Sequence, residues 1–275
     1  MIINGKQIAD TILSQIKQEV AAMPFQPVFC DVLVGNDSVS ASYVKIKGKK
    51  AVEAGMKFLP VLLPGDISQK ALEAKIRELN LWLGLCGLVV QLPLPQGLAE
   101  RPVLDTVLPA CDVDGMGWRN QELFYSGQAA MVMPTAAAIR AIFETLQIDI
   151  HKQVVVVGQG ELVGRPTAFL LKKMGYSVKT ADRSVGDIKA LCLEADVLVS
   201  ATGTPNLITG DMVKAGSVVI DAGTSESGGS IVGDVDAASV GPVAGFLTPV
   251  PGGVGPVTVA MLLSNVLACA KEKLK

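Results

Sequence analysis

The chain has 275 residues, of which 49% are hydrophobic and 18% are charged, with 24 Lys and Arg residues against 26 Asp and Glu residues. This composition excludes an intrinsically disordered protein and predicts a sizeable core in one large or two modest domains. The net charge of −2 gives no sign of a basic surface. We therefore expect neither a nucleic acid nor an anionic membrane surface as a partner.

The start of the chain lacks the basic and apolar segments of a secretory signal peptide. The longest nearly continuous apolar stretch, residues 81–90, is too short to span a bilayer. Polar residues interrupt the longer run at 255–270, which is better explained as a core helix. We therefore predict a cytoplasmic location.

The spacing of the cysteines and the single histidine argues against a metal site. The five cysteines are odd in number, form no CxxC pair, and stand among apolar neighbours, which is typical of reduced core residues. They are Cys30, Cys86, Cys111, Cys192 and Cys269. With His151 as the one histidine, no His-rich site can be built, so we expect no metal and place His151 at the surface.

The first half of the chain alternates strand-length apolar runs with helical periodicity, a pattern typical of βαβ units around a parallel sheet. Ile8, Ile12, Ile16 and Val20 recur every four residues and predict the buried face of a first helix. After it we predict strands at 28–34, 57–63 and 85–92, and helices at 38–54 and 68–79. Prolines at 93 and 95 end the third strand, because proline cannot continue a hydrogen-bonded ladder.

Periodicity fades between residues 93 and 128, where we expect a long irregular segment. A second alternating block follows it. We predict helices at 135–146, at 162–174 and from about 257 to the end, and strands at 154–157, 177–181, 197–201 and 217–221. The order of elements predicts an α/β protein.

A glycine-rich turn joins the strand at 154–157 to the helix that follows. Gly158, Gly160 and Gly164 form a G-x-G-x-x-x-G pattern, one residue longer than the usual dinucleotide fingerprint. Such glycines let a pyrophosphate approach the backbone at the positive N-terminus of a helix. The alternative is that the glycines serve only the packing of helix on sheet.

The end of the next strand bears on the choice of cofactor. Asp182 lies 24 residues beyond Gly158, near the spacing at which an acid accepts a hydrogen bond from a ribose hydroxyl. A carboxylate there repels a 2′-phosphate and favours NAD over NADP, although the adjacent Arg183 could clamp that phosphate instead. Glycine-containing breaks at 201–203 and 221–223 also follow strand ends, which line the ligand crevice of a doubly wound sheet. Simple turn chemistry is the alternative for both.

Tyr43 and Lys47 are four residues apart on a predicted helix, so their side chains share one face. Taken alone, such a pair is most often a surface tyrosine beside a solvated lysine. Short-chain dehydrogenases also carry Tyr-x-x-x-Lys, but after their glycine turn, whereas here the pair comes first, which excludes that class. Gln91 closes an apolar strand and needs a partner, because burying its amide unpaired costs about 1–3 kcal/mol. Lys47 is a candidate for that partner.

Two carboxylates, Asp112 and Asp114, lie in the predicted irregular segment. An ordinary Asp-Gly turn would account for them, but a carboxylate can also accept two N–H groups from an aminopyrimidine ring. Further along, three prolines and three glycines at 249–256 precede the last helix. They predict a stiff loop that exposes its backbone at a helix N-terminus, as a ligand-binding loop does.

Seven motifs in a fixed order span nearly the whole chain. They are Ile3-Asn-Gly-Lys6, Tyr43-x-x-x-Lys47, Val90-Gln-Leu-Pro-Leu-Pro95, Asp112-Val-Asp-Gly115, Val163-Gly-Arg-Pro166, Gly233-Asp-Val-Asp236 and Thr248-Pro-Val-Pro-Gly-Gly-Val-Gly-Pro256. In these motifs the chain resembles the bifunctional methylenetetrahydrofolate dehydrogenase/methenyltetrahydrofolate cyclohydrolase family. The last motif is the most specific of the seven.

The resemblance implies a three-layer α/β N-terminal domain, residues 1–128, onto which the C-terminal helix 259–275 packs back. It implies a Rossmann-like, doubly wound NAD(P)-binding domain at residues 129–258, a folate cleft between the two domains, and a homodimer. The implied activity is oxidation of 5,10-methylenetetrahydrofolate to 5,10-methenyltetrahydrofolate, then hydrolysis to 10-formyltetrahydrofolate. These reactions belong to one-carbon metabolism and supply purine biosynthesis.

The resemblance also implies roles for particular residues. Tyr43 would stack on the pterin, Lys47 would serve the hydrolysis, Gln91 would tune Lys47, and Asp112 or preferably Asp114 would anchor the pterin amine. Other implied folate contacts are Val90, Leu92, Pro251, Gly252 and Gly253. The implied cofactor contacts are Gly158, Gln159, Gly160, Gly164, Asp182, Arg183, Thr202, Gly203, Gly223, Thr224 and Thr258.

The implied chemistry suits a chain with one surface histidine. Hydride transfer needs chiefly positioning, whereas attack of water on the methenyl cation needs a proton acceptor, a task for a lysine that is partly neutral in a low-dielectric cleft. The chain departs from the family pattern at Gly158-Gln-Gly160, where Gly-Arg-Ser is usual, and this loss of an arginine again favours NAD. It also has Met133-Pro-Thr-Ala136 where Pro-Cys-Thr-Pro is usual. A monofunctional dehydrogenase and a non-catalytic dinucleotide-sensing protein on the same fold are the alternatives.

Overall fold

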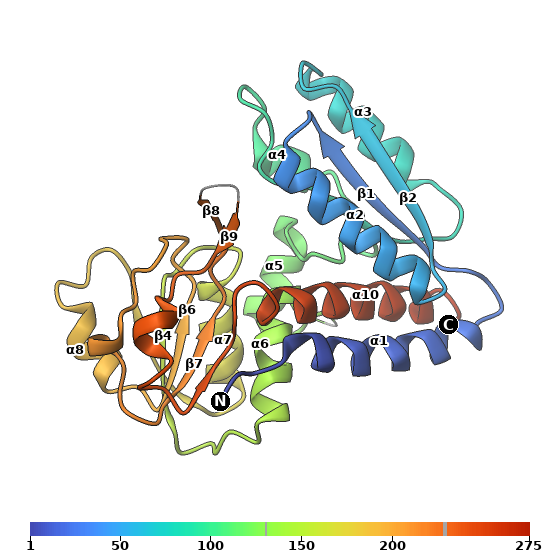
Figure 1. Cartoon of the computed structure of the whole chain (residues 1–275). Coiled ribbons are helices and arrows are strands. Elements are labelled where there is room, and N and C mark those ends of the chain that lie inside the picture. The colour runs from blue at the N-terminus through green and yellow to red at the C-terminus, as the bar shows by residue number, and fades with distance from the viewer. Residues whose placement is uncertain (130, 228–229) are drawn as a thin grey trace. The chain divides into compact units, whose positions relative to one another are not determined.

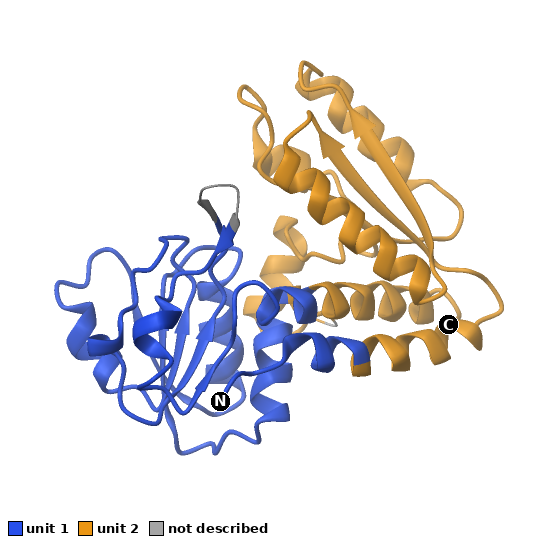
Figure 2. Ribbon diagram, in the orientation of Figure 1, with its two compact units in different colours: residues 1–10, 135–258 blue, residues 11–134, 259–275 orange. Residues whose placement is uncertain are grey.

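The computed structural model describes residues 1–129, 131–227 and 230–275 (Figure 1). The chain divides into two compact units, coloured separately in Figure 2. The first unit comprises residues 1–10 and 135–258, and the second unit comprises residues 11–134 and 259–275. Each unit is built on its own parallel sheet, so the predicted two-domain α/β architecture is confirmed.

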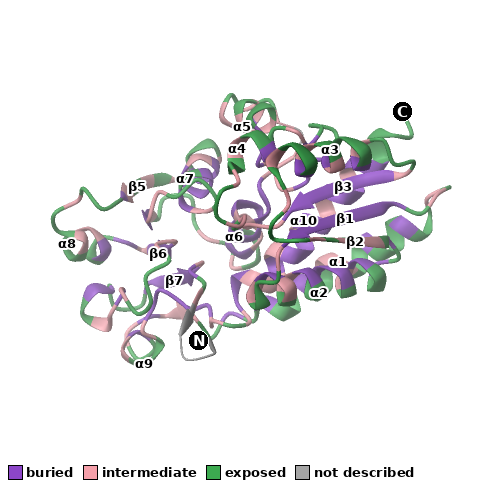
Figure 3. Ribbon diagram, turned by 90° about the horizontal axis from the view of Figure 1, so that it is seen from above, coloured by how far each residue is buried: buried purple, intermediate pink, exposed green. Residues whose placement is uncertain are grey.

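The sheet of the second unit has the order β2-β1-β3, with all strands parallel. Its strands are β1 (Val28–Val34), β2 (Lys57–Leu63) and β3 (Leu85–Val90). Both β1 and β3 are buried along their whole length, and Figure 3 shows them in purple. Alternate residues of β1 enter two different hydrophobic clusters, Phe29 on one face of the sheet and Cys30 on the other. The sheet is therefore the middle layer of three.

Helices supply the outer two layers of this unit. They are α2 (Ser38–Glu53), α3 (Gln69–Asn80), α4 (Glu100–Leu104) and α5 (Trp118–Tyr125), with the part of α1 (Gly5–Ala21) from residue 11 and the part of α10 (Val254–Glu272) from residue 259. Residues of α1, α2 and α10 pack with Phe29, whereas residues of α3 and α4 pack with Cys30. The predicted helices are thus confirmed, with α10 starting three residues earlier than expected. Pro256 stands in its first turn, where a missing N–H group costs nothing.

The prediction of a long irregular segment at 93–128 is wrong, because α4 and α5 lie within it. Both are short: α4 has five residues with a proline at its third position, and α5 has eight. One or two turns are not enough to establish a hydrophobic period.

The first unit has a five-stranded parallel sheet in the order β10-β7-β6-β4-β5. Its strands are β4 (Gln153–Val157), β5 (Ser177–Ala181), β6 (Val197–Ser200), β7 (Val218–Asp221) and β10 (Phe246–Leu247), with a separate hairpin of β8 (Ser225–Ser227) and β9 (Ser230–Val232). Its helices are α6 (Pro134–Thr145), α7 (Gly164–Lys173), α8 (Ile188–Leu193), α9 (Ala237–Val240) and the 3₁₀ turn η1 (Gly210–Met212). The four strands predicted here are confirmed, whereas α8, α9, β10 and the β8–β9 pair were not predicted.

The beginning of the chain is tied into this sheet. The Ile3 N–H donates to the Leu247 carbonyl oxygen and the Leu247 N–H donates to the Met1 carbonyl oxygen, each at 2.9 Å. The far end of the chain lies in the second unit, where Leu263, Val266 and Ala270 of α10 are fully buried. By length and composition α10 could cross a membrane, but its burial in the core is that of a helix inside a folded unit.

The five cysteines are free and buried, as expected. His151 is exposed, also as expected.

Candidate active site

Lys47 is held inside the second unit by two polar side chains. Its ammonium nitrogen Nζ lies 2.7 Å from Asp31 Oδ2 and donates a hydrogen bond of 2.8 Å to Gln91 Oε1. Lys47 is only 7% exposed, so neither contact is a solvated surface pair. It belongs to the buried face of α2, where a Cβ on the neighbouring Gly48 would come within 2.3 Å of the Phe58 ring. The missing side chain at Gly48 lets α2 lie close against the sheet.

Gln91 follows directly after β3 and is fixed at both ends of its amide. Its Oε1 accepts from Lys47, its Nε2 donates to the Leu92 carbonyl oxygen at 3.0 Å, and its backbone N–H donates to the Val32 carbonyl oxygen at 2.8 Å. The predicted contact between Gln91 and Lys47 is therefore confirmed. With Nε2 already directed at a carbonyl, the amide presents its oxygen, not its nitrogen, to the lysine.

Asp31 is a member of the cluster that the sequence reasoning missed. It stands in the middle of β1 and is fully buried. Neither of its carboxylate oxygens accepts a hydrogen bond in the described structure, and Oδ2 makes the ion pair with Lys47. Burial raises the pKa of its carboxyl above the usual range, and the neighbouring Lys47 ammonium opposes that rise. The available signal was one acidic residue inside a seven-residue strand that is otherwise apolar.

Asp112 and Asp114 are separated by one residue in the loop beyond β3, and their environments differ. Asp112 is buried, and its carboxylate accepts from the backbone N–H groups of Gly115, Met116 and Gly117 at 2.9–3.2 Å. The Asn120 amide also donates to it, at 3.1 Å. Asp112 is thus engaged in shaping the turn, and its folate contact stays a prediction.

Asp114 is half-buried, and no hydrogen-bond donor to its carboxylate is found among the described residues. Burial raises the pKa of its carboxyl to about 6; the Lys47 ammonium lowers it, while Asp112 and Asp31 raise it further. The pKa of the Asp114 carboxyl therefore depends on the charges of Lys47 and Asp31, and its oxygens are available to accept hydrogen bonds from a ligand.

The other expected folate contacts of this unit differ in exposure. Tyr43 is half-buried on α2, one turn before Lys47, as its spacing predicted. Val90 is buried in the hydrophobic cluster that contains Cys30, and Leu92 packs against the same cluster. Their side chains thus contribute to the core.

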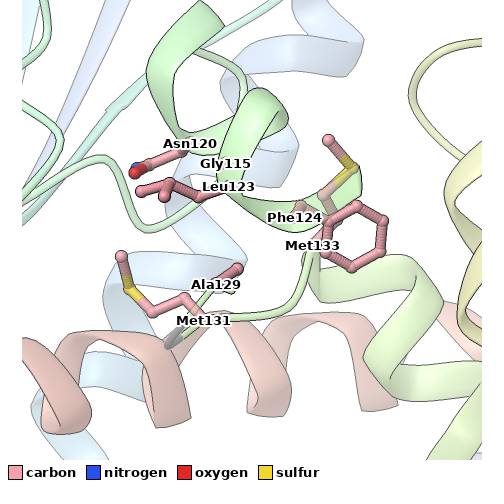
Figure 4. Close-up of a pocket in the computed structure, with 7 residues that line it drawn as sticks. All are labelled: Gly115, Asn120, Leu123, Phe124, Ala129, Met131 and Met133. Atoms are coloured by element: carbon pink, nitrogen blue, oxygen red, sulfur yellow. The ribbon is translucent and has the colours of Figure 1, made fainter. Parts of the chain in front are cut away.

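A small pocket lies beside the Asp112 turn, lined by Gly115, by three residues of α5 and by three residues that follow this helix (Figure 4). Its one side-chain amide, Asn120, is already directed at Asp112. Its lining is otherwise apolar and includes none of Lys47, Gln91 and Asp114. The pocket therefore offers no group that could transfer a proton or bind a charged ligand.

In the first unit, the glycine-rich turn contains glycines of two kinds. Gly158 has φ +91°, and a Cβ there would come within 2.2 Å of the Ala201 carbonyl oxygen. A Cβ at Gly164 would come within 1.8 Å of the Gly158 carbonyl oxygen. At Gly160, by contrast, a Cβ would meet nothing within 4 Å. The fold itself demands Gly158 and Gly164, whereas the open space over Gly160 fits the approach of a ligand such as a pyrophosphate.

Two of the residues expected to select the nucleotide, Gln159 and Asp182, already take part in hydrogen bonds within the protein. Gln159 folds back over its own turn, with Nε2 donating to the Gly158 carbonyl oxygen at 2.8 Å. Asp182 and Arg183 are exposed directly after β5. The N–H and hydroxyl groups of Ser184 donate to Asp182 Oδ1 at 2.8 and 2.5 Å and hold the pKa of its carboxyl below the usual range. The Asp182 carboxylate is therefore charged at neutral pH and fixed in direction.

Two buried carboxylates shape the carboxyl ends of β6 and β7. Asp234 accepts from the Ser200 hydroxyl and from the Thr202 N–H at 2.9 and 2.6 Å. Asp221 accepts from the N–H groups of Gly223, Asp234 and Val235, and burial raises its pKa to about 6. A Cβ on Gly223 would come within 2.0 Å of Asp234, so this glycine is required by the carboxylate. The exposed residues Gly203 and Thr224 flank this framework.

The proline- and glycine-rich loop before α10 is buried at one point and open at others. A Cβ on Gly253 would come within 2.5 Å of the Pro249 carbonyl oxygen, and a Cβ on Gly5 would come within 1.8 Å of the Gly253 carbonyl oxygen. The loop therefore lies closely on the start of α1. Pro251 is exposed, Gly252 has φ +106°, and the Thr258 hydroxyl donates back to the helix at Val254.

Comparison with known proteins identifies the family. Residues 3–114 match the tetrahydrofolate dehydrogenase/cyclohydrolase catalytic domain, and residues 133–274 match the corresponding NAD(P)-binding domain. The chain is 38% identical to bifunctional protein FolD of Lacticaseibacillus paracasei over 98% of both chains, and 41% identical to that of Sulfurihydrogenibium sp. over 100% of this chain and 99% of the other.

Comparison with solved structures leads to the same family. The bifunctional enzyme FolD of Campylobacter jejuni superposes with a TM-score of 0.95, at 33% identity over 99% of each chain. The Trypanosoma brucei enzyme, determined with NADP and an inhibitor, superposes with a TM-score of 0.94, at 33% identity over 100% of this chain and 98% of the other. The chain belongs to the tetrahydrofolate dehydrogenase/cyclohydrolase family.

Proposed function

We propose that this family member performs its two reactions with separate residue groups, one in each unit. The enzyme oxidises 5,10-methylenetetrahydrofolate to 5,10-methenyltetrahydrofolate and hydrolyses the product to 10-formyltetrahydrofolate, in one-carbon metabolism. The first unit holds the nicotinamide cofactor, and the second unit holds the folate and carries out the hydrolysis. The proposal that the functional domains are residues 1–128 with 259–275, and residues 129–258, rests on the same division of tasks.

The single observation that supports this assignment most is the buried Lys47 amine between Asp31 and Gln91. In the hydrolysis, water adds to the methenyl carbon while its proton passes to the neutral Lys47 amine. The bond from that carbon to N5 then breaks: the added hydroxyl group loses its proton to become the formyl oxygen, N5 takes up a proton, and the formyl group remains on N10, with one proton released overall. Tyr43 stacks on the pterin, and Asp114 accepts two N–H groups from the aminopyrimidine ring.

The oxidation needs no proton acceptor. When bound, the nicotinamide would supply the acceptor for a hydride from the methylene carbon of the folate. The residues of this chain supply position: the backbone at Gly160 faces the pyrophosphate, Asp182 binds the ribose, and the loop at 251–258 borders folate and nicotinamide.

We propose that the cofactor is NAD. Asp182 is charged and held in place by Ser184, and Gln159 stands where the family pattern has an arginine. A carboxylate repels a 2′-phosphate, which favours NAD. We also propose that the enzyme is a cytoplasmic homodimer.

A charge-removing substitution tests the cofactor assignment. Asp182→Asn is expected to raise kcat/KM for NADP by about tenfold, equivalent to about 1.4 kcal/mol, because it removes the repulsion. Ser184→Ala is the matched control: it removes the hydroxyl donor to Asp182 but keeps the backbone N–H donor and the charge, so NADP use should stay low. Initial rates with both cofactors measure the effect. A native enzyme that prefers NADP would contradict the assignment and point to Arg183.

The pKa of Asp114 predicts a pH dependence of folate binding. Burial raises that pKa to about 6, and only the ionised carboxylate accepts two N–H groups. The kcat/KM of the oxidation should therefore fall as the pH drops through about 6. In Asp114→Asn the value should be low and independent of pH in this range. A native profile that is flat through the same range would remove Asp114 from folate binding.

A further inference from the structure

The central strand of the second unit carries one charged residue in a fully buried position. Asp31 is 0% exposed, and in the sheet it is flanked by Pro60 on β2 and Val89 on β3, neither of which has a polar side chain. Lys47 supplies its one ion pair in the described structure. Burying a charged side chain costs folding free energy, and a well-packed apolar residue would fill the same position without that cost.

The contacts of Asp31 control the direction of the Lys47 amine. Oxygens of Asp31 and Gln91 lie 2.7 and 2.8 Å from Nζ. A lysine nitrogen has a tetrahedral arrangement of three hydrogens and its carbon when charged, or two hydrogens and a lone pair when neutral. The contact with Gln91 is a hydrogen bond and the contact with Asp31 is an ion pair, so the two oxygens together fix the position of Nζ.

The charges around this pair are few. Lys47 faces Asp31 from α2, Asp114 interacts with both from the loop beyond β3, and the thiol of Cys30 lies next to Asp31 on β1. Burial raises the pKa of the Asp31 carboxyl, and the Lys47 ammonium opposes that rise. A carboxylate form of Asp31 stabilises the ammonium form of Lys47.

We propose that Asp31 is a positioning residue for the hydrolysis: together with Gln91 it directs the Lys47 amine, and its negative charge stabilises the ammonium form of that amine. The proposal rests on the function proposed above for Lys47. It adds a control on the hydrolysis that leaves the oxidation unaffected, because the oxidation transfers no proton to Lys47.

The sign of the pH effect follows from the charge. Asp31→Asn removes the negative charge and keeps an oxygen that can accept from Lys47. Without the carboxylate the ammonium form loses its counter-ion, so the neutral amine is populated at lower pH. Asp31→Val removes both the charge and the acceptor, and therefore also the direction of the amine.

The test measures kcat of both reactions across pH at saturating folate, so that binding through Asp114 does not enter. For Asp31→Asn we expect the acid limb of the hydrolysis to move by about one pH unit or more to lower pH, with a plateau within about threefold of the native value. For Asp31→Val we expect a plateau at least about tenfold lower. The kcat profile of the oxidation should be unchanged in both variants.

An unchanged hydrolysis profile in Asp31→Asn, or a shift to higher pH, would overturn the proposal. So would a parallel loss of hydrolysis and oxidation, which would mark Asp31 as purely structural. Lys47→Met separates this failure from failure of the proposed function. If Lys47→Met still hydrolyses the methenyl compound, the role of Lys47 itself is wrong; if it does not, and Asp31→Asn behaves as native, only the role of Asp31 is wrong.

Discussion

Replacing Lys47 with methionine is expected to reduce hydrolysis of 5,10-methenyltetrahydrofolate by about 10³-fold, within the range for loss of a general base. Oxidation of the methylene compound should keep a kcat within a few-fold of native, because hydride transfer requires no proton acceptor. The methenyl product should then accumulate. Absorbance of the reduced cofactor and of the methenyl compound, followed separately, measures both steps.

Stability must be controlled in this experiment. Removing Lys47 leaves the Asp31 carboxylate buried without its counter-ion, which costs about 3–5 kcal/mol. The double variant with Asp31→Asn removes that charge and should recover most of the loss in thermal unfolding. Lys50→Met is the matched control, since Lys50 lies on the same helix but pairs at the surface with Glu53. Hydrolysis at the native rate in folded Lys47→Met would refute the assigned role.

Gly164→Ala is expected to abolish oxidation by disrupting the nucleotide-binding turn. The added Cβ would lie 1.8 Å from the Gly158 carbonyl oxygen, a backbone atom with little freedom to move. We expect a loss of about 3 kcal/mol in the free energy of unfolding, at the upper end for overpacking. Displacement of the turn should also weaken NAD binding by at least about 100-fold. Thermal unfolding and NAD titration measure the two effects.

Gly160→Ala is the matched control in the same turn, since its Cβ would meet no protein atom within 4 Å. It should fold with native stability and lose NAD affinity alone, because the added methyl group occupies the space where the pyrophosphate approaches. Native stability and affinity in Gly164→Ala would show that the turn adapts. Native NAD affinity in Gly160→Ala would place the pyrophosphate elsewhere.

The sequence predicted those features that have a strong local signal. Strands β1, β3 and β4 are mainly apolar and have a glycine or proline at one end or both, and the strands β1 to β7 all lie at or near the expected residues. The contact of Gln91 with Lys47 was also predictable, because an amide at the end of an apolar strand needs a partner and few polar residues were at hand.

Other features depend on tertiary contacts that no local pattern encodes. The short helices α4, α5 and α8 are too brief to establish a period. Asp112 and Asp114 look equivalent in the sequence. Only the folded turn shows that the Asp112 carboxylate accepts hydrogen bonds from three backbone N–H groups. Asp31 could not be assigned from the sequence, because its partner Lys47 lies on a different element, α2.

One assay of the native enzyme tests the proposed function most directly. Purified protein is mixed with 5,10-methylenetetrahydrofolate and NAD, and NADH, methenyltetrahydrofolate and 10-formyltetrahydrofolate are quantified separately over time. We expect NADH and the formyl product in equal amounts, with little methenyl compound remaining. If the methenyl compound accumulates and is hydrolysed only at the non-enzymatic rate, the hydrolytic role of Lys47 is contradicted. If no NADH forms, the cofactor assignment is contradicted.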